Sequence, residues 1–344
     1  MSRCSVFVLA AAAIATTTIA CGFHPGAGGD AQGGQGDDGG GGSGAEAGID
    51  GAASPIDAPP GSCMALWHTG TVPSFNSPES LGINTTRFER DPVVTADERT
   101  LYFSSNRDSA ADADVYVVTR ASASDSFDAG GIAHPTDFSP HVDLVSNQSK
   151  VTFPDDVTNM IYADDRNSTT SHLWHSSKVA GMAFRTAEQT DLTAVNLAGT
   201  SQADPTLSAD GKRLYFAAVL ADGHQHIMVA TRAAASGPFG TPVVIAELDS
   251  LTGDADPALS QDETVILFSS FRDFATNQGD LFYAVRSDLA HPFGPVQALA
   301  PINDSTEDGD PFLSADGCTV YFATDRNGDA LDYDLWDATM IHAQ

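Results

Sequence analysis

One motif recurs four times in this chain and constrains its fold more than any other feature. The copies begin at Asp91, Asp204, Asp256 and Asp310, and the second reads Asp204-Pro-Thr-Leu-Ser-Ala-Asp-Gly-Lys-Arg-Leu-Tyr-Phe. The last three copies are 52 and 54 residues apart, and the first gap of 113 residues holds two such periods. A period of this length indicates one supersecondary unit repeated along the chain. A residue present in every unit is therefore expected to be structural.

Each unit contains short runs of strand-forming residues broken by turn residues, with no helical period longer than a turn or two. In the unit at Asp204 we expect strands at 205–208, 213–218, 226–232 and 239–248, with a tight turn at 209–212. Four antiparallel strands per unit are typical of a β-propeller blade.

The number of blades follows from counting strands. A degenerate unit around Ser149–Asp156 fills the long gap, which makes five sets of the first three strands. Outer strands are visible in only four places: 138–145, 184–195, 239–248 and 293–302. The segment 71–84 resembles 293–303, so we predict that it supplies the missing outer strand of the last unit. The sequence thus predicts an all-β, five-bladed propeller closed by an N-terminal outer strand, with six blades as the alternative.

The units resemble the TolB-type, WD40-like β-propeller repeat, whose core reads Asp-Pro-x-Leu-Ser-x-Asp-Gly-x-x-Leu-x-Phe-x-Ser-x-Arg. The resemblance covers about residues 64–344 and implies a propeller that serves as a binding platform. Two units depart from the pattern: Ser149-Lys150 replaces Asp-Pro in the second, and Leu220 in the third replaces the usual Arg. The other units carry Arg107, Arg166, Arg272 and Arg326 there.

Residues 1–20 resemble a bacterial lipoprotein signal peptide. A short positively charged start is followed by an apolar run to Ala20 that is too short to span a bilayer comfortably. The run ends Thr18-Ile19-Ala20-Cys21-Gly22, which resembles a lipobox whose Cys21 becomes lipidated. Thr18 stands where Leu is usual. Ordinary secretion, with cleavage near Ala20, is the alternative.

The domains predicted after the signal are a tether and a propeller. Residues 21–60 are rich in Gly and Asp and cannot bury enough apolar surface to order themselves, so we expect a disordered tether before the 61–344 domain. This layout predicts a lipid-anchored protein of the bacterial cell envelope, with outer-membrane placement because Gly22 is not Asp. A secreted or periplasmic protein is the alternative.

The net charge excludes some classes of binding partner, and the cysteine content suggests a disulfide. A net charge of -30 argues against nucleic acid and against anionic membrane surfaces, which leaves the lipid anchor as the membrane contact. Two cysteines, Cys63 and Cys318, remain in the mature domain. They are candidates for a disulfide, and two separately buried thiols are the alternative.

The strongest candidate site is a ring at one mouth of the central channel. Its members precede the innermost strands and are Asp91, Lys150, Asp204, Asp256 and Asp310. Converging carboxyls would raise one another's pKa or recruit a cation, whereas the structural reading is that Asp caps the loop entering each strand.

We expect no cofactor and no metal site. Calcium at Asp325–Asp334 is a weak candidate, because the spacing does not fit an EF-hand loop. The close histidine pairs, His224 with His226 and His172 with His175, are expected to be solvated loop residues.

These features together predict a monomeric, non-enzymatic platform that binds an envelope protein, a peptide or a glycan. The alternative is a five-bladed glycoside hydrolase of the furanosidase type, with Asp91 among its acids. A catalytic Asp belongs in one blade, however, and this Asp recurs in four. Glycoside hydrolysis also needs a second carboxyl at a set separation. We therefore assign no catalytic residue from the sequence.

Overall fold

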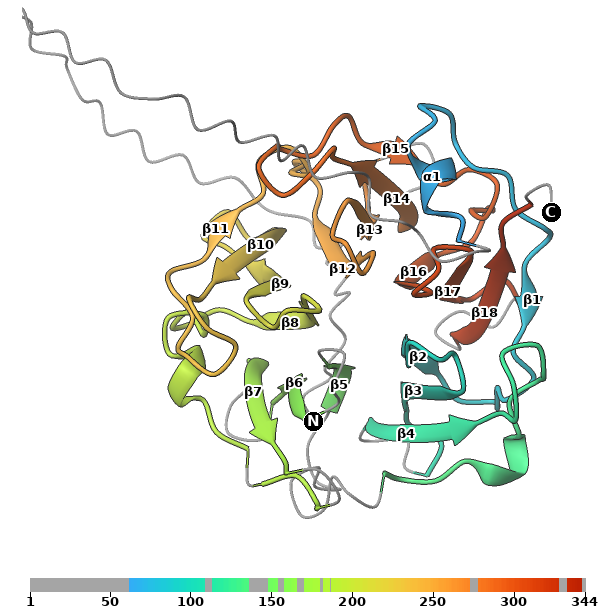
Figure 1. Ribbon diagram of the computed structural model, residues 1–344, viewed down its shortest axis with the longest axis horizontal. Helices are drawn as coiled ribbons and strands as arrows, with labels where there is room; N and C mark the ends of the chain where they lie inside the picture. Colours follow the sequence, from blue (N-terminus) through green and yellow to red (C-terminus); the bar gives the residue numbers. More distant parts are fainter. Residues whose placement is uncertain are drawn as a thin grey trace, which may run out of the picture. The chain divides into compact units, whose positions relative to one another are not determined.

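The computed structural model describes residues 62–108, 113–135, 148–153, 158–165, 170–179, 182–185, 187–272, 278–327 and 333–341. Five small antiparallel sheets stand around a central axis like the blades of a propeller (Figure 1). The prediction of an all-β, five-bladed propeller is confirmed, and the six-bladed alternative is wrong.

Consecutive strands pair within each blade, from the axis outward. Blade one holds β2 (Glu89–Val94), β3 (Thr100–Ser105) and β4 (Asp114–Thr119), and blade two holds β5 (Gln148–Thr152), β6 (Asn159–Asp164) and β7 (His172–Ser177). Blade three holds β8 (Gln202–Leu207), β9 (Arg213–Val219), β10 (Gln225–Thr231) and β11 (Val243–Val244). Blade four holds β12 (Asp254–Leu259), β13 (Val265–Ser270), β14 (Asp280–Val285) and β15 (Gln297–Ala298). Blade five holds β16 (Asp308–Leu313), β17 (Thr319–Thr324), β18 (Asp334–Thr339) and β1 (Glu79–Ser80).

The outer strands are much shorter than predicted. β11 and β15 are two residues long, and Pro242 and Pro295, which lack an N–H to donate, lie at or near their starts. In blade two the predicted strand at 184–195 makes one bridge, between His175 and Glu188, before the turn η2 (Thr190–Leu192). The predicted strand at 138–145 lies outside the described residues. Blade one has a bridge between Val117 and Ala133 next to η1 (Ala129–Gly131).

Apolar side chains fill the spaces between blades. Between blades three and four, for example, Ile227 and Tyr215 pack with Ile266 and Phe268 of β13. The residues of the middle strands thus alternate between one neighbouring blade and the other, which follows from the period of two along a strand. No helix in the described ranges combines the length and apolar character that crossing a membrane would require.

The N-terminal segment closes the ring, as the sequence predicts. β1 pairs antiparallel with β18, with Glu79 opposite Asp337 and Ser80 opposite Trp336. Asn84 extends the contact, because its side-chain amide accepts from Leu335 N and donates to Leu335 O at 2.9 and 3.0 Å. Figure 1 shows β1 beside β18, so the first described strand completes the last blade.

This closing pair is weak by itself because it sets like charges face to face. Burial, and then Glu79, raise the pKa of Asp337 to about 6. Acidic residues directly opposite in an antiparallel pair destabilise it once both are ionised. The closure of the ring at neutral pH therefore needs other contacts.

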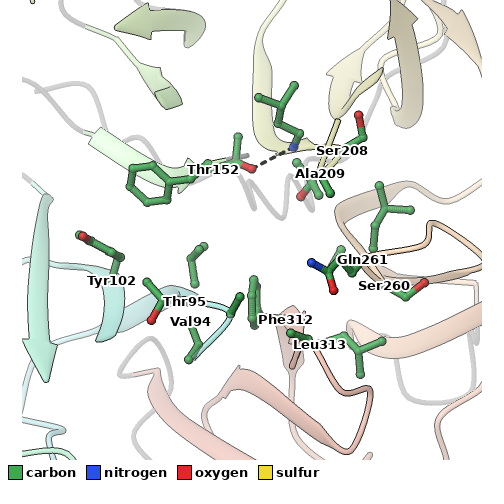
Figure 2. Close-up of a pocket in the computed structure, with 18 of the residues that line it drawn as sticks. Val94, Thr95, Tyr102, Thr152, Ser208, Ala209, Ser260, Gln261, Phe312 and Leu313 are labelled. Atoms are coloured by element: carbon green, nitrogen blue, oxygen red, sulfur yellow. Dashed lines mark hydrogen bonds between the residues drawn. The ribbon is translucent and has the colours of Figure 1, made fainter. Parts of the chain in front are cut away.

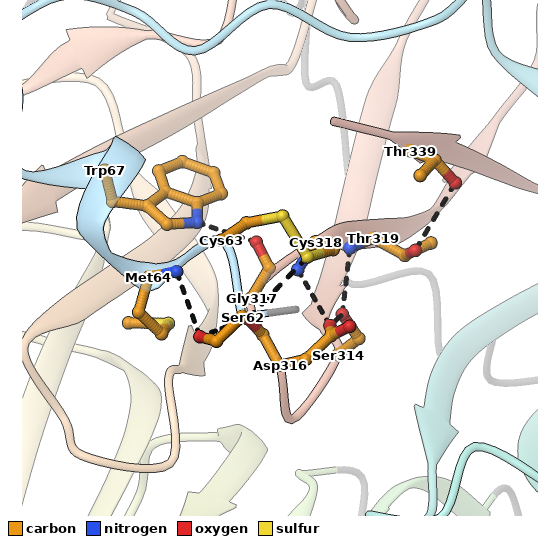
Figure 3. The surroundings of a disulfide bond; sticks show 10 residues. All are labelled: Ser62, Cys63, Met64, Trp67, Ser314, Asp316, Gly317, Cys318, Thr319 and Thr339. Atoms are coloured by element: carbon orange, nitrogen blue, oxygen red, sulfur yellow. Dashed lines mark hydrogen bonds between the residues drawn. A yellow bond between two sulfur atoms is a disulfide. The ribbon is translucent and has the colours of Figure 1, made fainter. Parts of the chain in front are cut away.

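A disulfide supplies one of them. Cys63 and Cys318 are bonded across a sequence separation of 255 residues, with their Cα atoms 4.9 Å apart. Figure 3 shows α1 (Met64–Trp67) lying over the turn before Cys318, where Trp67 Nε1 donates to Gly317 O at 2.9 Å and Cys63 N donates to Asp316 O at 2.9 Å. Met64 packs closely against Gly317, where an added Cβ would lie 2.4 Å from the Met64 sulfur and would force that side chain to move. The N-terminal segment and the last blade are thus covalently joined.

We expect the double variant Cys63→Ser/Cys318→Ser to lose about 2–5 kcal/mol of unfolding free energy, because its unfolded chain regains the freedom that the cross-link removes. Denaturant unfolding of the purified protein measures the loss. The wild-type protein under reducing conditions should match the variant. Equal midpoints for the oxidised wild type and the variant would contradict this role.

Candidate functional site

Every blade places a strained residue at the same point of its innermost strand. Positive φ angles occur at Asp91 (56°), Lys150 (32°), Asp204 (54°), Asp256 (53°) and Asp310 (49°). The pairing register shifts at each of these points, for instance between Ala203 and Thr206. Such a bulge re-aims a side chain, and Asp tolerates the left-handed region better than most residues. The five residues therefore lie within the inner strands, whereas the sequence reading placed them before the strands.

The bulges bring all five predicted ring residues together at the channel axis. Each is buried, with 2–6 % of its surface exposed. Lys150 Nζ donates to Pro257 O of blade four at 3.2 Å. Arg90, which the sequence reading did not single out, pairs with Asp310 at 2.7 Å. Four acids thus share the axis with two bases.

Identical acids in this ring have opposite pKa shifts. Burial raises the pKa of Asp204 well above its ordinary value, and Asp256 and Asp91 add to the rise. Burial would also raise the pKa of Asp256, but Lys150, the Ser269 hydroxyl and Arg90 together lower it. Asp204 hydrogen-bonds to Asp256. Asp204 Oδ2 is buried and has no hydrogen-bond partner among the described residues.

One hydroxyl distinguishes these two blades. Ser269 Oγ donates to Asp256 Oδ2 at 2.5 Å from the strand next to it. The same register position holds Ala217 beside Asp204 in blade three. Blade five also has an alanine there, and burial likewise raises the pKa of its Asp310, against the opposing effect of Arg90. The Ser269 hydroxyl thus favours the ionised form of one carboxyl only.

A pocket of about 450 Å³ opens where the inner strands end (Figure 2). The last residues of β2, β5, β8, β12 and β16 line it, and Lys150 links it to the ring level. Its other polar walls are hydroxyls and one amide, from residues such as Thr95, Thr152, Ser208, Ser260 and Gln261. Aromatic side chains are Tyr102, Phe153 and Phe312. Lys150 and Asp97 are the charged lining residues, and Asp97 already accepts from Thr95 at 2.6 Å.

The remaining sequence candidates have varied outcomes. Cys21 and the tether lie outside the described residues, as does part of the calcium candidate at Asp325–Asp334. In its described part, Asn327 donates to Asp334. Within the ranges that the structure describes, no group of three or more His, Cys, Asp or Glu residues has the arrangement to hold a metal ion.

His226 corrects the expectation of solvated histidines. It is buried, and its ring nitrogens lie 2.6 Å from Asp249 and 2.9 Å from Asp222. Burial lowers the pKa of His226, but the two carboxylates outweigh burial and raise it. The repeat could have indicated this contact, because Asp249 of blade three is equivalent to Asn303 of blade four. This carboxylate was overlooked because it is far from His226 in sequence.

No protein-family model matches this chain, and no curated protein does. Solved structures do match its fold. A thermostable family-43 glycoside hydrolase is 14 % identical with a TM-score of 0.51, over 77 % of this chain and 93 % of that one. The catalytic domain of the GH62 α-L-arabinofuranosidase of Coprinopsis cinerea is 11 % identical with a TM-score of 0.50, over 78 % and 97 %. TolB from Acinetobacter baumannii is 16 % identical with a TM-score of 0.45 over 74 % of this chain, which spans about half (54 %) of that protein's length.

At these identities the likeness shows the fold alone, a β-propeller. The prediction of a non-enzymatic binding platform is nonetheless wrong in its premise that the fold disfavours an enzyme, because similar solved structures include glycoside hydrolases. The prediction took the recurrence of Asp in four blades as evidence against catalysis. Recurrence of Asp does not exclude catalysis, because residues at equivalent positions can differ chemically. Asp204 and Asp256 are an example, since their pKa values shift in opposite directions.

We expect Lys150→Met to destabilise the protein by about 3–5 kcal/mol at pH 7, because a buried carboxylate loses its counter-charge. Since Lys150 helps to lower the pKa of Asp256, its contribution is present above the unfolded pKa of Asp and fades as pH falls through the folded value. Urea unfolding at pH 7 and below pH 4 measures the loss of unfolding free energy and its decrease at low pH. The exposed Lys212→Met is the matched control. An equal loss at the two pH values would assign Lys150 a packing role instead.

Proposed function

We propose that this protein is a glycoside hydrolase whose site is the channel pocket and the carboxyl ring beneath it. The observation that carries the proposal is the pair of neighbouring carboxyls with opposite pKa shifts, Asp204 raised and Asp256 lowered. Titratable groups whose environments separate their pKa values mark acid and base assignments. Glycoside hydrolysis needs one protonated carboxyl and one ionised carboxylate.

In this proposal Asp204 protonates the leaving oxygen as the glycosidic bond breaks, and Asp256 is the carboxylate that stabilises the developing positive charge. A water molecule then adds to the anomeric carbon and returns a proton to Asp204. In the unliganded protein the two share a hydrogen bond. Neither Asp204 nor Asp256 lines the pocket itself, so in this proposal the glycosidic oxygen enters the level of the ring and takes the place of Asp256 as acceptor of the Asp204 proton. That exchange opens the pair toward the roughly 5 Å or more that two-carboxyl glycosidases use.

The pocket supports a neutral sugar as the substrate. Its volume of about 450 Å³ lies within the range of small-ligand sites, and its walls combine hydroxyls, an amide and aromatic rings. Lys150 already bonds Pro257 O and interacts with its acidic neighbours, so none of the described lining residues offers a free cation for an anionic ligand. An aryl α-L-arabinofuranoside is the first substrate to test, because the similar GH62 structure is an α-L-arabinofuranosidase.

We expect Asp204→Asn to lower kcat on a cleaved aryl furanoside by about 10²–10⁴-fold, because an amide keeps the hydrogen bond to Asp256 but donates no proton to the leaving group. Its unfolding free energy should change little, since burial already disfavours a charge at Asp204. Asp256→Asn should lower both kcat and stability. In the wild type, activity should fall at high pH as Asp204 ionises and at low pH as Asp256 protonates.

Release of 4-nitrophenol from a panel of furanosides and pyranosides is the measurement. The exposed Asp288→Asn is the control for loss of a carboxylate elsewhere. Turnover that survives Asp204→Asn unchanged would contradict the assignment. No turnover and no binding across the panel would contradict the function itself.

We also propose that the enzyme is anchored in the bacterial cell envelope, at the outer membrane, through lipidated Cys21. The lipobox-like Thr18–Gly22 segment and the Gly-rich stretch after it support this placement. A tether of about 40 residues would let the propeller reach roughly 35 Å from its lipid to a nearby glycan.

Cys21→Ser should release the protein from membranes, because a lipid-modified N-terminus is the anchor in this proposal. Fractionation of cells after a high-salt wash measures the distribution, and Cys4→Ser is the matched control. A Cys21→Ser protein that still sediments with membranes would contradict the anchor.

A further inference from the structure

The outer segments of blades two, four and five are fastened to the third strand by the same contact. An Asn at the end of the segment exchanges two hydrogen bonds with one residue of that strand. In blade four, Asn303 accepts from Leu281 N and donates to Leu281 O, both at 3.0 Å. The equivalent pairs are Asn196 with Leu173 and Asn84 with Leu335. Because an amide is neutral and carries both an acceptor and donors, this contact does not change with pH.

Blade three departs from this pattern at two positions that meet in space. Asp249 stands where the other segments have Asn, and a carboxylate has no N–H to donate to the carbonyl of Ile227. His226 precedes Ile227 in β10. Its equivalents in blades one, four and five are Asp114, Asp280 and Asp334. His226 Nδ1 lies 2.6 Å from Asp249 Oδ1. A contact between two side chains thus takes the place of the amide contact.

The other ring nitrogen of His226 has a partner as well. Nε2 lies 2.9 Å from Asp222 Oδ2, in the loop between β9 and β10. A carboxylate only accepts hydrogen bonds, so a ring that bonds two carboxylates must carry both of its protons. The buried imidazolium of His226 therefore bridges two segments that flank β10. They are the loop 220–224 and the outer segment 243–249, whose β11 pairs with β10 (Figure 1).

Charged groups on the neighbouring strands do not compete for this bridge. On β9 the residue opposite His226 is the uncharged Ala218. On β12 of the next blade, Asp254 is already paired with Arg272 at 2.6 Å. Arg272 also donates to Leu248 O at 2.5 Å, a contact that a change at His226 leaves intact.

The loop contributes one further titratable group, His224. It is exposed and donates its backbone N–H to Asp222 at 3.0 Å, so it lies on the solvent side of the bridge. Asp222 and Asp249 are the groups that raise the pKa of His226 against the opposing effect of burial.

We propose that His226 is a pH-sensitive switch, whose protonated form holds the loop 220–224 and the outer segment 243–249 on β10. Loss of the proton turns one donor into a lone pair that faces a carboxylate, so one of the two segments is released. The raised pKa of His226 sets the direction of the effect. Its contribution is complete below the unfolded value of about 6.5 and is lost as pH rises through the folded value. This inference does not depend on the proposed function.

The test compares the full-length wild type with the exchange variant His226→Asp/Asp249→Asn, which gives blade three the Asp–Asn pair of blade four. The amide of Ile245 donates to Ile227 O at 3.0 Å and reports on the outer segment. At pH 5.5 it should exchange with solvent equally fast in both proteins. At pH 8.5 it should exchange about 10-fold faster in the wild type, the size expected when one charge-assisted hydrogen bond is lost. Hydrogen–deuterium exchange of the 243–249 peptide, read by mass spectrometry, measures both rates.

A second variant, His226→Gln, removes the charge and keeps a polar side chain. At pH 5.5 its melting temperature should lie about 3–8 °C below that of the wild type, and the difference should shrink at pH 8.5. The exposed His224→Gln is the matched control and should show no such difference. A melting difference of equal size at both pH values would assign His226 a packing role and overturn the inference. Equal exchange of Ile245 in the wild type and the exchange variant at pH 8.5 would overturn it as well.

Discussion

The buried charge on the channel axis must be balanced, and this balance connects blades that are not neighbours in sequence. Arg90 of blade one pairs with Asp310 of blade five at 2.7 Å, and Lys150 of blade two donates to the backbone of blade four at 3.2 Å. Two bases face four acids, and burial raises the pKa of Asp204 and of Asp310, in the second case against the opposing effect of Arg90. Removing Arg90 or Lys150 would leave buried carboxyls without the base that favours their ionised form.

The fold was predictable because the same pattern of strands and turns recurs in each repeat unit. The missing outer strand of the last unit pointed to 71–84, and Asn84 indeed bonds Leu335 where Asn303 bonds Leu281 in blade four. The outer strands were overestimated because apolar content alone cannot reveal that the prolines near β11 and β15 withhold donors. The bulges were also hidden, since an Asp-Pro pair reads as the start of a strand rather than its middle.

The site was predictable only in part, for a related reason. Repetition located the ring, because equivalent positions in a propeller converge on the axis. Arg90 was missed, although the sequence could have indicated it. The equivalent residues in the other blades are all small, so a large side chain at this position enters the channel from blade one alone: they are Ser149, Ala203, Ala255 and Gly309. The pocket could not be foreseen, because its walls come from turns and strand ends whose meeting depends on the closed ring.

A repeat protein acquires chemistry where one copy differs from the others beside a residue that does not differ. Asp204 and Asp256 occupy the same bulge of the same motif, yet the pKa of one is raised and that of the other lowered. The Ser269 hydroxyl faces one of them, and Ala217 stands in its place beside the other. The Ser269 hydroxyl, together with Lys150 where the other blades have an acid, thus holds the pKa of Asp256 below its ordinary value, whereas that of Asp204 stays above it. The Asp that recurs in the repeat units builds the ring, and the residues beside each Asp determine its pKa.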